Sequence, residues 1–214
     1  MISTSKLAAV LATAGVLLAA CSTQSTQSIV APTAGASWQV DNAKSSFNFV
    51  TTKAGQAGTN SITEVSSFKR FAGGVDAQGT IELVIDLASV DTGIEIRDER
   101  VKTILFNVGA TPQAKFAAKI DPAFLRNLSS NAVSDIAVKG TLTIAAQTKP
   151  AEATLRVSRI GAASLQVSTL APIVVNANDY GLKAGVEGLR DLMGLNVLSP
   201  AAPISFALVM NEKR

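Results

Sequence analysis

Residues 81–87 read IELVIDL, and this short stretch decides the fold. All four odd-numbered positions carry Ile or Leu, while Glu82 and Asp86 occupy even-numbered positions. Side chains at every second position of a β-strand lie on the same face of the sheet. The stretch therefore predicts a strand with one face against an apolar core and the other, including Asp86, in solvent.

The same period of two recurs along most of the chain after Trp38. It is found in residues 47–49, 138–144, 153–160, 165–168 and 204–210. Gly, Asn, Asp and Pro cluster between these segments and predict turns at 73–74, 121–122, 127–131, 161 and 176–181. Two segments, 97–106 and 186–195, instead carry apolar residues at helical spacing, and each predicts a short helix. Many strands and few helices indicate a single all-β domain, a barrel or a sandwich.

The N-terminal residues 1–20 have the features of an export signal. Lys6 supplies a positive charge, and residues 7–18 form an apolar stretch interrupted only by Thr13. This stretch is shorter than the roughly 20 residues that a transmembrane helix needs. Small residues then precede Cys21, as in a bacterial lipoprotein signal peptide, whose cysteine becomes the lipid-modified N-terminus. The alternative is an ordinary cleaved signal with an incidental cysteine.

Cys21 is the only cysteine, so it has no disulfide partner within the chain. We expect it to carry acyl chains such as palmitate, which would anchor the protein in a membrane. Residues 21–36 are rich in Ser, Thr, Gln, Ala, Pro and Gly and predict a flexible tether before a domain at 37–214. The expected location is the bacterial cell envelope, facing the periplasm. In lipoproteins of this type, an aspartate directly after the cysteine favours the inner membrane. Ser22 stands at that position here, which favours the outer membrane.

The composition argues against several classes of function. The 214 residues include no histidine, which excludes Ser-His-Asp and Cys-His catalysis, histidine metal ligands and a histidine ligand to haem. The net charge of +3 is small, and the basic residues are scattered without interleaved aromatic residues, so nucleic-acid binding is not expected. We expect no catalytic residues, no metal site and no enzyme activity.

The order of short motifs along the chain is more specific than any one of them. These are WQVD at 38–41, FNF at 47–49, IDLASVDTG at 85–93, RDER at 97–100, FNV at 106–108, PQAKF at 112–116, VKGTLTI at 138–144, TKP at 148–150 and NDYGL at 178–182. From Trp38 to Met210 the chain resembles the YceI-like family of bacterial polyisoprenoid-binding proteins. The resemblance implies an extended eight-stranded antiparallel lipocalin-like barrel with one or two short helices. It also implies export and a long apolar cavity for an isoprenoid lipid or isoprenoid quinone.

Three positions depart from the family pattern. Arg100 stands where members often have a histidine, Ala177 stands where they often have an arginine, and Tyr180 replaces a phenylalanine. Such changes bear on recognition of a ligand headgroup more than on the apolar lining.

The inward apolar face of the barrel supplies the candidate ligand-binding residues. They are Phe47, Phe49, Ile81, Leu83, Ile85, Leu142, Ile144, Phe206 and Leu208. The alternative is that these side chains fill a packed core, because the interior of an eight-stranded barrel can be filled or can hold one small ligand.

Polar and aromatic candidates complete the predicted site. Arg97 is a candidate for contact with a headgroup, since arginine binds phosphate and carbonyl oxygen well. Asp98 is expected to stabilise the start of a helix instead. Tyr180 is a further candidate contact, and Trp38 is expected to plug one end of the barrel.

The function expected from the sequence is a non-enzymatic carrier that sequesters an amphiphilic isoprenoid, a polyprenyl lipid or a quinone, away from water. The alternative is a filled barrel that acts as a structural or protein-interaction module of the envelope. The expected partners are the isoprenoid and the membrane that holds the anchor, and no cofactor is expected apart from a bound lipid or quinone. A homodimer is among the oligomeric states that the sequence allows.

Overall fold

The computed structural model describes residues 36–55 and 60–213. The predicted signal peptide, the predicted tether up to residue 35 and Cys21 lie outside the described residues. Within the described part, the dominant element is a large antiparallel sheet that closes on itself.

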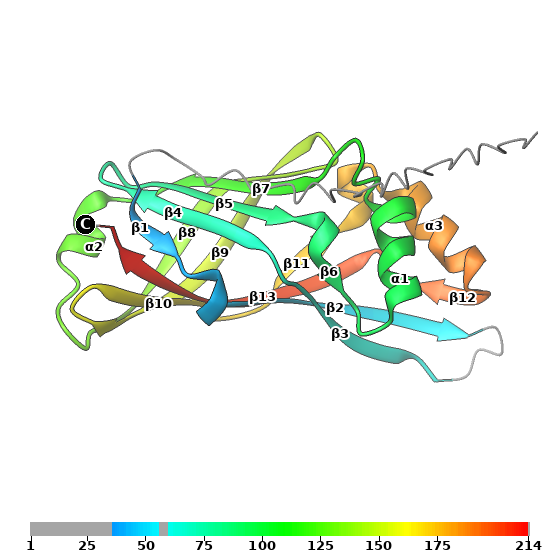
Figure 1. Ribbon diagram of the computed structural model, residues 1–214, viewed down its shortest axis with the longest axis horizontal. Coiled ribbons are helices and arrows are strands. Elements are labelled where there is room, and N and C mark those ends of the chain that lie inside the picture. The colour runs from blue at the N-terminus through cyan, green and yellow to red at the C-terminus, as the bar shows by residue number, and fades with distance from the viewer. Residues whose placement is uncertain (1–35, 56–59, 214) are drawn as a thin grey trace, which may run out of the picture.

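Eight strands form the closed ring (Figure 1). In ring order they are β1 (Ala36–Val40), β4 (Phe71–Asp76), β5 (Thr80–Asp86), β7 (Gln113–Lys119), β8 (Val133–Ile144), β9 (Gln147–Gly161), β10 (Ser164–Thr169) and β13 (Ala201–Glu212). β13 closes the ring by pairing with β1, with Val40 opposite Met210. This confirms the predicted eight-stranded antiparallel barrel.

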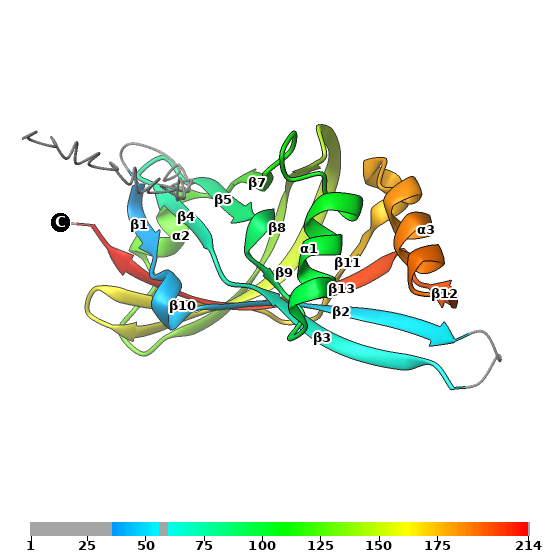
Figure 2. The same cartoon turned by 45° about the vertical axis from the view of Figure 1, so that its right-hand side comes forward.

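Further strands extend the barrel beyond one end of the ring (Figure 2). They are β2 (Ser46–Gly55), β3 (Ile62–Phe68), β6 (Val90–Asp91), β11 (Ile173–Asn176) and β12 (Leu195–Leu198). β13 again organises them, because Ile204 lies opposite Phe49 of β2 on one edge and opposite Ile173 of β11 on the other. In this extension, β11 pairs only with β13 among the described strands, so the wall is incomplete here.

Short helices cover the two ends of the molecule. Beside the extension lie α1 (Glu95–Arg100), the π-helical turn η3 (Val101–Leu105) and α3 (Lys183–Leu192), whereas α2 (Pro122–Arg126) lies at the opposite end (Figure 1). The 3-10 turns are η1 (Asn42–Lys44), η2 (Leu87–Ser89) and η4 (Ala177–Tyr180). Gly185 allows α3 to approach η3 closely, because a Cβ atom there would lie 2.8 Å from the carbonyl oxygen of Ile104.

The core consists of two clusters of buried side chains. One cluster, around Trp38 and Leu165, packs against residues of α2 such as Phe124 and fills that end of the barrel. Trp38 is 6% exposed, and the guanidinium of Arg159 lies 5.4 Å from its ring centroid, which agrees with the expected plug. The other cluster, around Phe47 and Leu87, packs against residues of η3 in the direction of the extension.

Several local predictions differ from the structure. Leu87 belongs to η2 instead of continuing β5, and Leu195 belongs to β12 because α3 ends at Leu192 and Gly194 follows with φ 61°. α2 was not predicted, although Asp121 accepts a hydrogen bond from the Ala123 amide and Pro122 occupies the first helical turn. Both residues are typical of a helix start as well as of a turn.

Two interpretations of single residues were wrong. Gly73 and Gly74 lie inside β4, where a Cβ on Gly73 would come within 2.8 Å of the Glu82 carbonyl oxygen, so these glycines allow close strand packing. Asp86 is 7% exposed instead of solvated. Its carboxylate contacts Arg70 Nη2 at 2.7 Å and accepts a hydrogen bond from the Ala88 amide, which explains how the charge tolerates burial.

The close packing at Gly140 of β8 gives a test of the fold. A Cβ there would lie 2.3 Å from the Ala117 carbonyl oxygen, whereas a Cβ on Gly55 of β2 would have no neighbour within 4 Å. We expect Gly140→Ala to lower the free energy of unfolding by about 1–3 kcal/mol through overpacking. Gly55→Ala, the matched control, should leave stability within about 1 kcal/mol of the wild type. Urea unfolding measures both, and equal stability of the two variants would contradict the described packing of β7 against β8.

Candidate functional site

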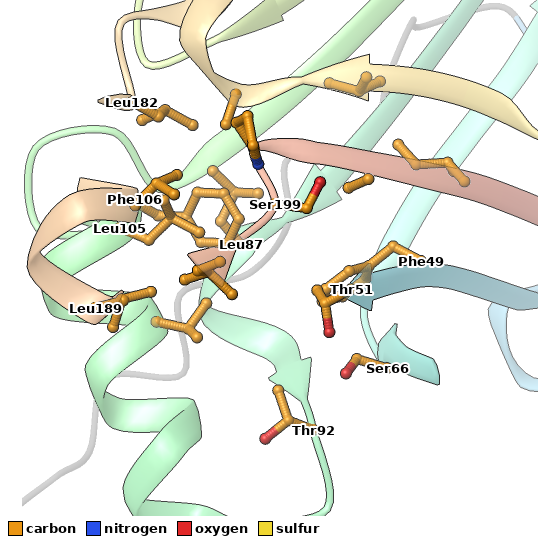
Figure 3. Close-up of a pocket in the computed structure, with 18 of the residues that line it drawn as sticks. Phe49, Thr51, Ser66, Leu87, Thr92, Leu105, Phe106, Leu182, Leu189 and Ser199 are labelled. Carbon is orange, nitrogen blue, oxygen red and sulfur yellow. The ribbon is translucent and has the colours of Figure 1, made fainter. Parts of the chain in front are cut away.

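The extended end of the barrel contains a cavity of about 180 Å³. Its walls come from the barrel strands, from α1, η3 and α3, and from the segment around Ser199 that leads into β13. Its surface is almost entirely apolar apart from one region. In Figure 3, Leu105, Phe106 and Leu189 lie on one side of the cavity, and the hydroxyl-bearing residues Thr51, Ser66 and Thr92 lie on the other.

Phenylalanine rings form the inner boundary of the cavity, next to the filled half of the barrel. Phe47 stacks on Phe206 at 5.8 Å between ring centroids and meets Phe68 edge-on at 6.1 Å. Phe68 also contacts Phe49 at 5.1 Å. Phe47, Phe49 and Phe68 line the cavity, while Phe206 lies behind Phe47. The cavity therefore ends against a layer of packed aromatic rings.

The helical elements supply a second apolar wall. Val101, Leu105 and Phe106 line the cavity from η3 and the residue after it, and Val186, Leu189 and Met193 line it from α3 and its C-terminal end. The Phe106 amide donates to the Val101 carbonyl, five residues earlier, at 3.0 Å. This wider π-type turn is a local feature often found at functional sites. The helical spacing of these residues predicted apolar helix faces, but it did not indicate that those faces line a cavity.

Two paired strands change from apolar to charged along their inward faces. On β2 the inward positions are Phe47, Phe49, Thr51 and Lys53, and on β3 they are Phe68, Ser66 and Glu64. Thr51 lies directly opposite Glu64 in the register, so Lys53 and Glu64 are diagonal neighbours on the same face. The cavity consequently has an aromatic inner end and a polar outer end.

An ion-pair cluster occupies this polar end. Glu64 Oε2 lies 2.8 Å from Lys53 Nζ and accepts a hydrogen bond from Arg97 Nη1 at 2.6 Å. Arg97 also donates from Nε to Thr92 Oγ1 at 2.9 Å and from Nη2 to the Thr92 carbonyl at 2.8 Å. Asp98 accepts hydrogen bonds from the Thr92 amide and hydroxyl, so it has a local structural role. The cluster joins α1 to the β2–β3 hairpin.

The neighbouring cations change the titration of Glu64. The hydrogen bond from Lys53, opposed in part by burial and supported by the charge of Arg97, lowers the pKa of Glu64 below its ordinary value. A lowered pKa means that ionised Glu64 stabilises the folded protein near neutral pH. That contribution is lost as the solution is acidified through the lowered pKa.

Six of the eleven predicted ligand-binding residues line the cavity. They are Phe47, Phe49, Ile85, Arg97, Leu142 and Ile144. The other five do not line it. Leu83, Phe206, Leu208 and Tyr180 belong to the packed cluster next to it, and Ile81 packs with the Trp38 cluster at the other end. Most of these residues were predicted to point inward, so inward orientation alone does not tell the two groups apart. The groups differ in their position along the barrel axis.

Tyr180 lies beside a separate hollow of about 510 Å³ between β9 and β11. Burial, with a smaller contribution from the charge of Asp179, raises the pKa of Tyr180 above its ordinary value. Of the three positions that depart from the family pattern, Arg100 and Ala177 line the apolar cavity.

Sequence reasoning missed the polar residues of the site other than Arg97 and Arg100. Lys53, Glu64, Ser66 and Thr92 were not singled out, although the alternation after Phe49 places Thr51 and Lys53 on the same face. Among residues 36–55 and 60–213 there is no group of three or more Asp, Glu, Cys or His placed to hold a metal ion. No helix in that same part of the chain is long and apolar enough to cross a membrane.

Comparisons with known proteins place the chain in a family. The family model described as the YceI-like domain matches residues 38–210. A solved polyisoprenoid binding domain from Saccharophagus degradans, implicated in plant cell wall breakdown, is 31% identical with a TM-score of 0.78, over 83% of this chain and 99% of that one. BcnA from Burkholderia cenocepacia shares the fold at 24% identity and a TM-score of 0.59, over 79% of this chain and 98% of its own. No curated protein sequence matches significantly. The chain therefore belongs to the family of proteins built on the YceI-like domain.

Proposed function

We propose that this protein binds an amphiphilic isoprenoid, a polyprenyl lipid or an isoprenoid quinone, and carries it without catalysing a reaction. The observation that supports this best is the apolar cavity between the phenylalanine layer and the helices. The relative from Saccharophagus degradans, described as a polyisoprenoid binding domain, supports the same ligand class. An isoprenoid tail has almost no polar atoms, so its binding depends on apolar area, at about 25 cal/mol per Å² removed from water.

The size of the cavity limits how a long tail can bind. An apolar cavity of roughly 150 Å³ holds a benzene-sized molecule, and pockets for larger ligands measure roughly 300–1,000 Å³. At about 180 Å³, the cavity accommodates part of a polyprenyl chain. The rest of the chain would enter if α1 moved away from the β2–β3 hairpin. The single ion-pair cluster described above, which links α1 to that hairpin, is suited to such opening.

We also propose that acylated Cys21 anchors the protein in the outer membrane with the barrel in the periplasm. The tether from Cys21 to Ala36 has 16 residues, and a fully extended segment of that length spans at most roughly 55 Å. The barrel would thus stay near the bilayer and exchange its ligand without long diffusion through water.

The alternative function is that of a filled barrel that acts as a structural or protein-interaction module. Only one end of the barrel agrees with this alternative. The Trp38 cluster fills that end. The hollow at the opposite end favours the carrier.

The proposed function is tested by isolating the full-length protein from membranes of its native host and analysing the organic extract by mass spectrometry. An isoprenoid lipid or quinone at about one molecule per protein supports the carrier. A protein that is repeatedly free of isoprenoids, and that also resists loading with quinones and polyprenols, would overturn it.

Filling the cavity should weaken ligand binding. Leu142 of β8 lines the cavity, and Thr141 beside it is exposed. We expect Leu142→Trp to displace roughly 60 Å² of ligand surface, about 1.5 kcal/mol, which corresponds to about tenfold weaker affinity for a polyprenol. Thr141→Trp controls for adding an indole to the same strand and should bind as the wild type does. Fluorescence titration measures both affinities, and unchanged affinity in Leu142→Trp would place the tail elsewhere.

The anchor is tested with labelled palmitate. Cells that express the wild-type protein should incorporate the label into it, because Cys21 is the only thiol in the chain. Cys21→Ser should abolish incorporation, whereas Ser22→Ala, next to it, should retain it. Equal labelling of Cys21→Ser and the wild type would contradict acylation at this position.

A further inference from the structure

The charged residues that line the cavity are unequal in sign. They are Lys53, Arg97 and Arg100, which are cationic, and Glu64, which is the single anion among them. Lys53, Glu64 and Arg97 meet at the polar end and Arg100 lies about one turn further along α1, so the charged lining residues together carry an excess of two positive charges. A neutral headgroup would leave that excess uncompensated in a partly buried site, where charges interact more strongly than in water.

Glu64 neutralises only part of this charge. One of its oxygens, Oε2, contacts both Lys53 Nζ and Arg97 Nη1, at 2.8 and 2.6 Å. The side chains of Arg97 and Lys53 are 17% and 20% exposed, whereas that of Glu64 is 31% exposed. The two cations are therefore held at the cavity, while the carboxylate is the most solvent-accessible member of the cluster. Its lowered pKa agrees with the cationic surroundings.

Arg100 contributes the third positive charge. It lies three residues after Arg97 on α1, and residues at this spacing are neighbours on one face of a helix. Within the part of the chain that the structure describes, no hydrogen bond or ion pair engages its side chain. Arg100 thus lines the cavity, its guanidinium has no partner among the described residues, and a guanidinium binds phosphate oxygens in a two-pronged geometry.

We propose that the cavity selects isoprenoids with an acidic phosphate-type headgroup, and that Glu64 occupies the position of this headgroup when no ligand is bound. The inference rests on the proposed function, because it assigns the headgroup of the same ligand. The headgroup contacts Lys53, Arg97 and Arg100, and Glu64 turns toward solvent as a competing internal anion. With Glu64 turned away, three cations face the headgroup, and a phosphate ester, which carries between one and two negative charges near neutral pH, offsets much of this charge, whereas a quinone carries none.

The test compares two ligands with the same C20 tail, geranylgeranyl phosphate and geranylgeraniol. Their affinities are measured by calorimetry with the full-length protein in detergent. We expect the wild type to bind the phosphate at least about tenfold more tightly than the alcohol. Arg100→Gln should reduce this preference severalfold, because the phosphate loses one of its cationic contacts. Arg156→Gln, in an exposed ion pair with Asp135, controls for the loss of one positive charge.

Removal of the internal anion should have the opposite effect. Glu64→Gln should increase the preference for the phosphate severalfold, because the cations lose their competing partner. Asp135→Asn removes one negative charge on the exposed surface of β8 and should not change the preference. A change of the same size in both variants would mean that net charge, and not the cavity cluster, sets the preference, which would overturn the assignment.

The remaining outcomes separate the two proposals. If neither ligand binds, the proposed function fails. If both ligands bind with equal affinity to the wild type, or if Arg100→Gln keeps the full preference, the proposed function stands and the headgroup assignment is overturned. Inorganic diphosphate distinguishes a lipid headgroup from a free anion. Displacement of geranylgeranyl phosphate by inorganic diphosphate at similar concentrations would assign the site to free anions instead.

Discussion

The pairing of β13 determines the architecture on which the cavity depends. Its C-terminal half lies between β1 and β10, where Met210 is opposite both Val40 and Leu165, and this closes the ring. Its N-terminal half lies between β2 and β11, and β11 has no second strand partner among the described strands. One end of the barrel is therefore a complete wall that side chains can fill. The other end is incomplete, and α1, η3 and α3 cover it without filling it.

A layer of phenylalanine rings, formed by Phe47, Phe49 and Phe68 with Phe206 behind Phe47, separates the filled end of the barrel from the cavity. Aromatic pairs such as Phe47–Phe206 contribute roughly 0.5–1.5 kcal/mol beyond their buried area, so the layer can remain packed beside an empty space. A cavity lined by flexible aliphatic side chains would collapse more readily, because the loss of packing contacts favours relaxation. The aromatic inner end thus defines where the cavity stops, and the helical elements form its opposite wall.

The period of two was sufficient to predict an all-β domain, a barrel or a sandwich, because it reports directly on which side chains face inward; the eight-stranded barrel was predicted from the resemblance to the YceI-like family. The sequence did not predict which of the inward side chains line the cavity, because the position of a residue along the barrel axis produces no periodic pattern. Ile81 and Ile85 share a face of β5, yet four residues at about 3.3 Å each place Ile81 in the filled end and Ile85 at the cavity. The ion-pair cluster was missed for a related reason. It joins Lys53, Glu64 and Arg97 from three separate elements, and their contact depends on a strand register and a helix position that no local pattern encodes.

The charged end of the cavity is poorly explained by stability alone. Partial burial of Lys53, Glu64 and Arg97 carries a desolvation cost that their mutual attraction offsets only in part, and apolar side chains of similar volume often stabilise such a position better. Arg100 adds a charge that has no counter-ion among the described residues. If the cluster served only to fasten α1 to the β2–β3 hairpin, one cation for the one carboxylate would be enough. The proposed phosphate headgroup, which would replace Glu64 as the counter-ion, gives these cations a partner, and the apolar lining beside them suits the chain that carries the headgroup.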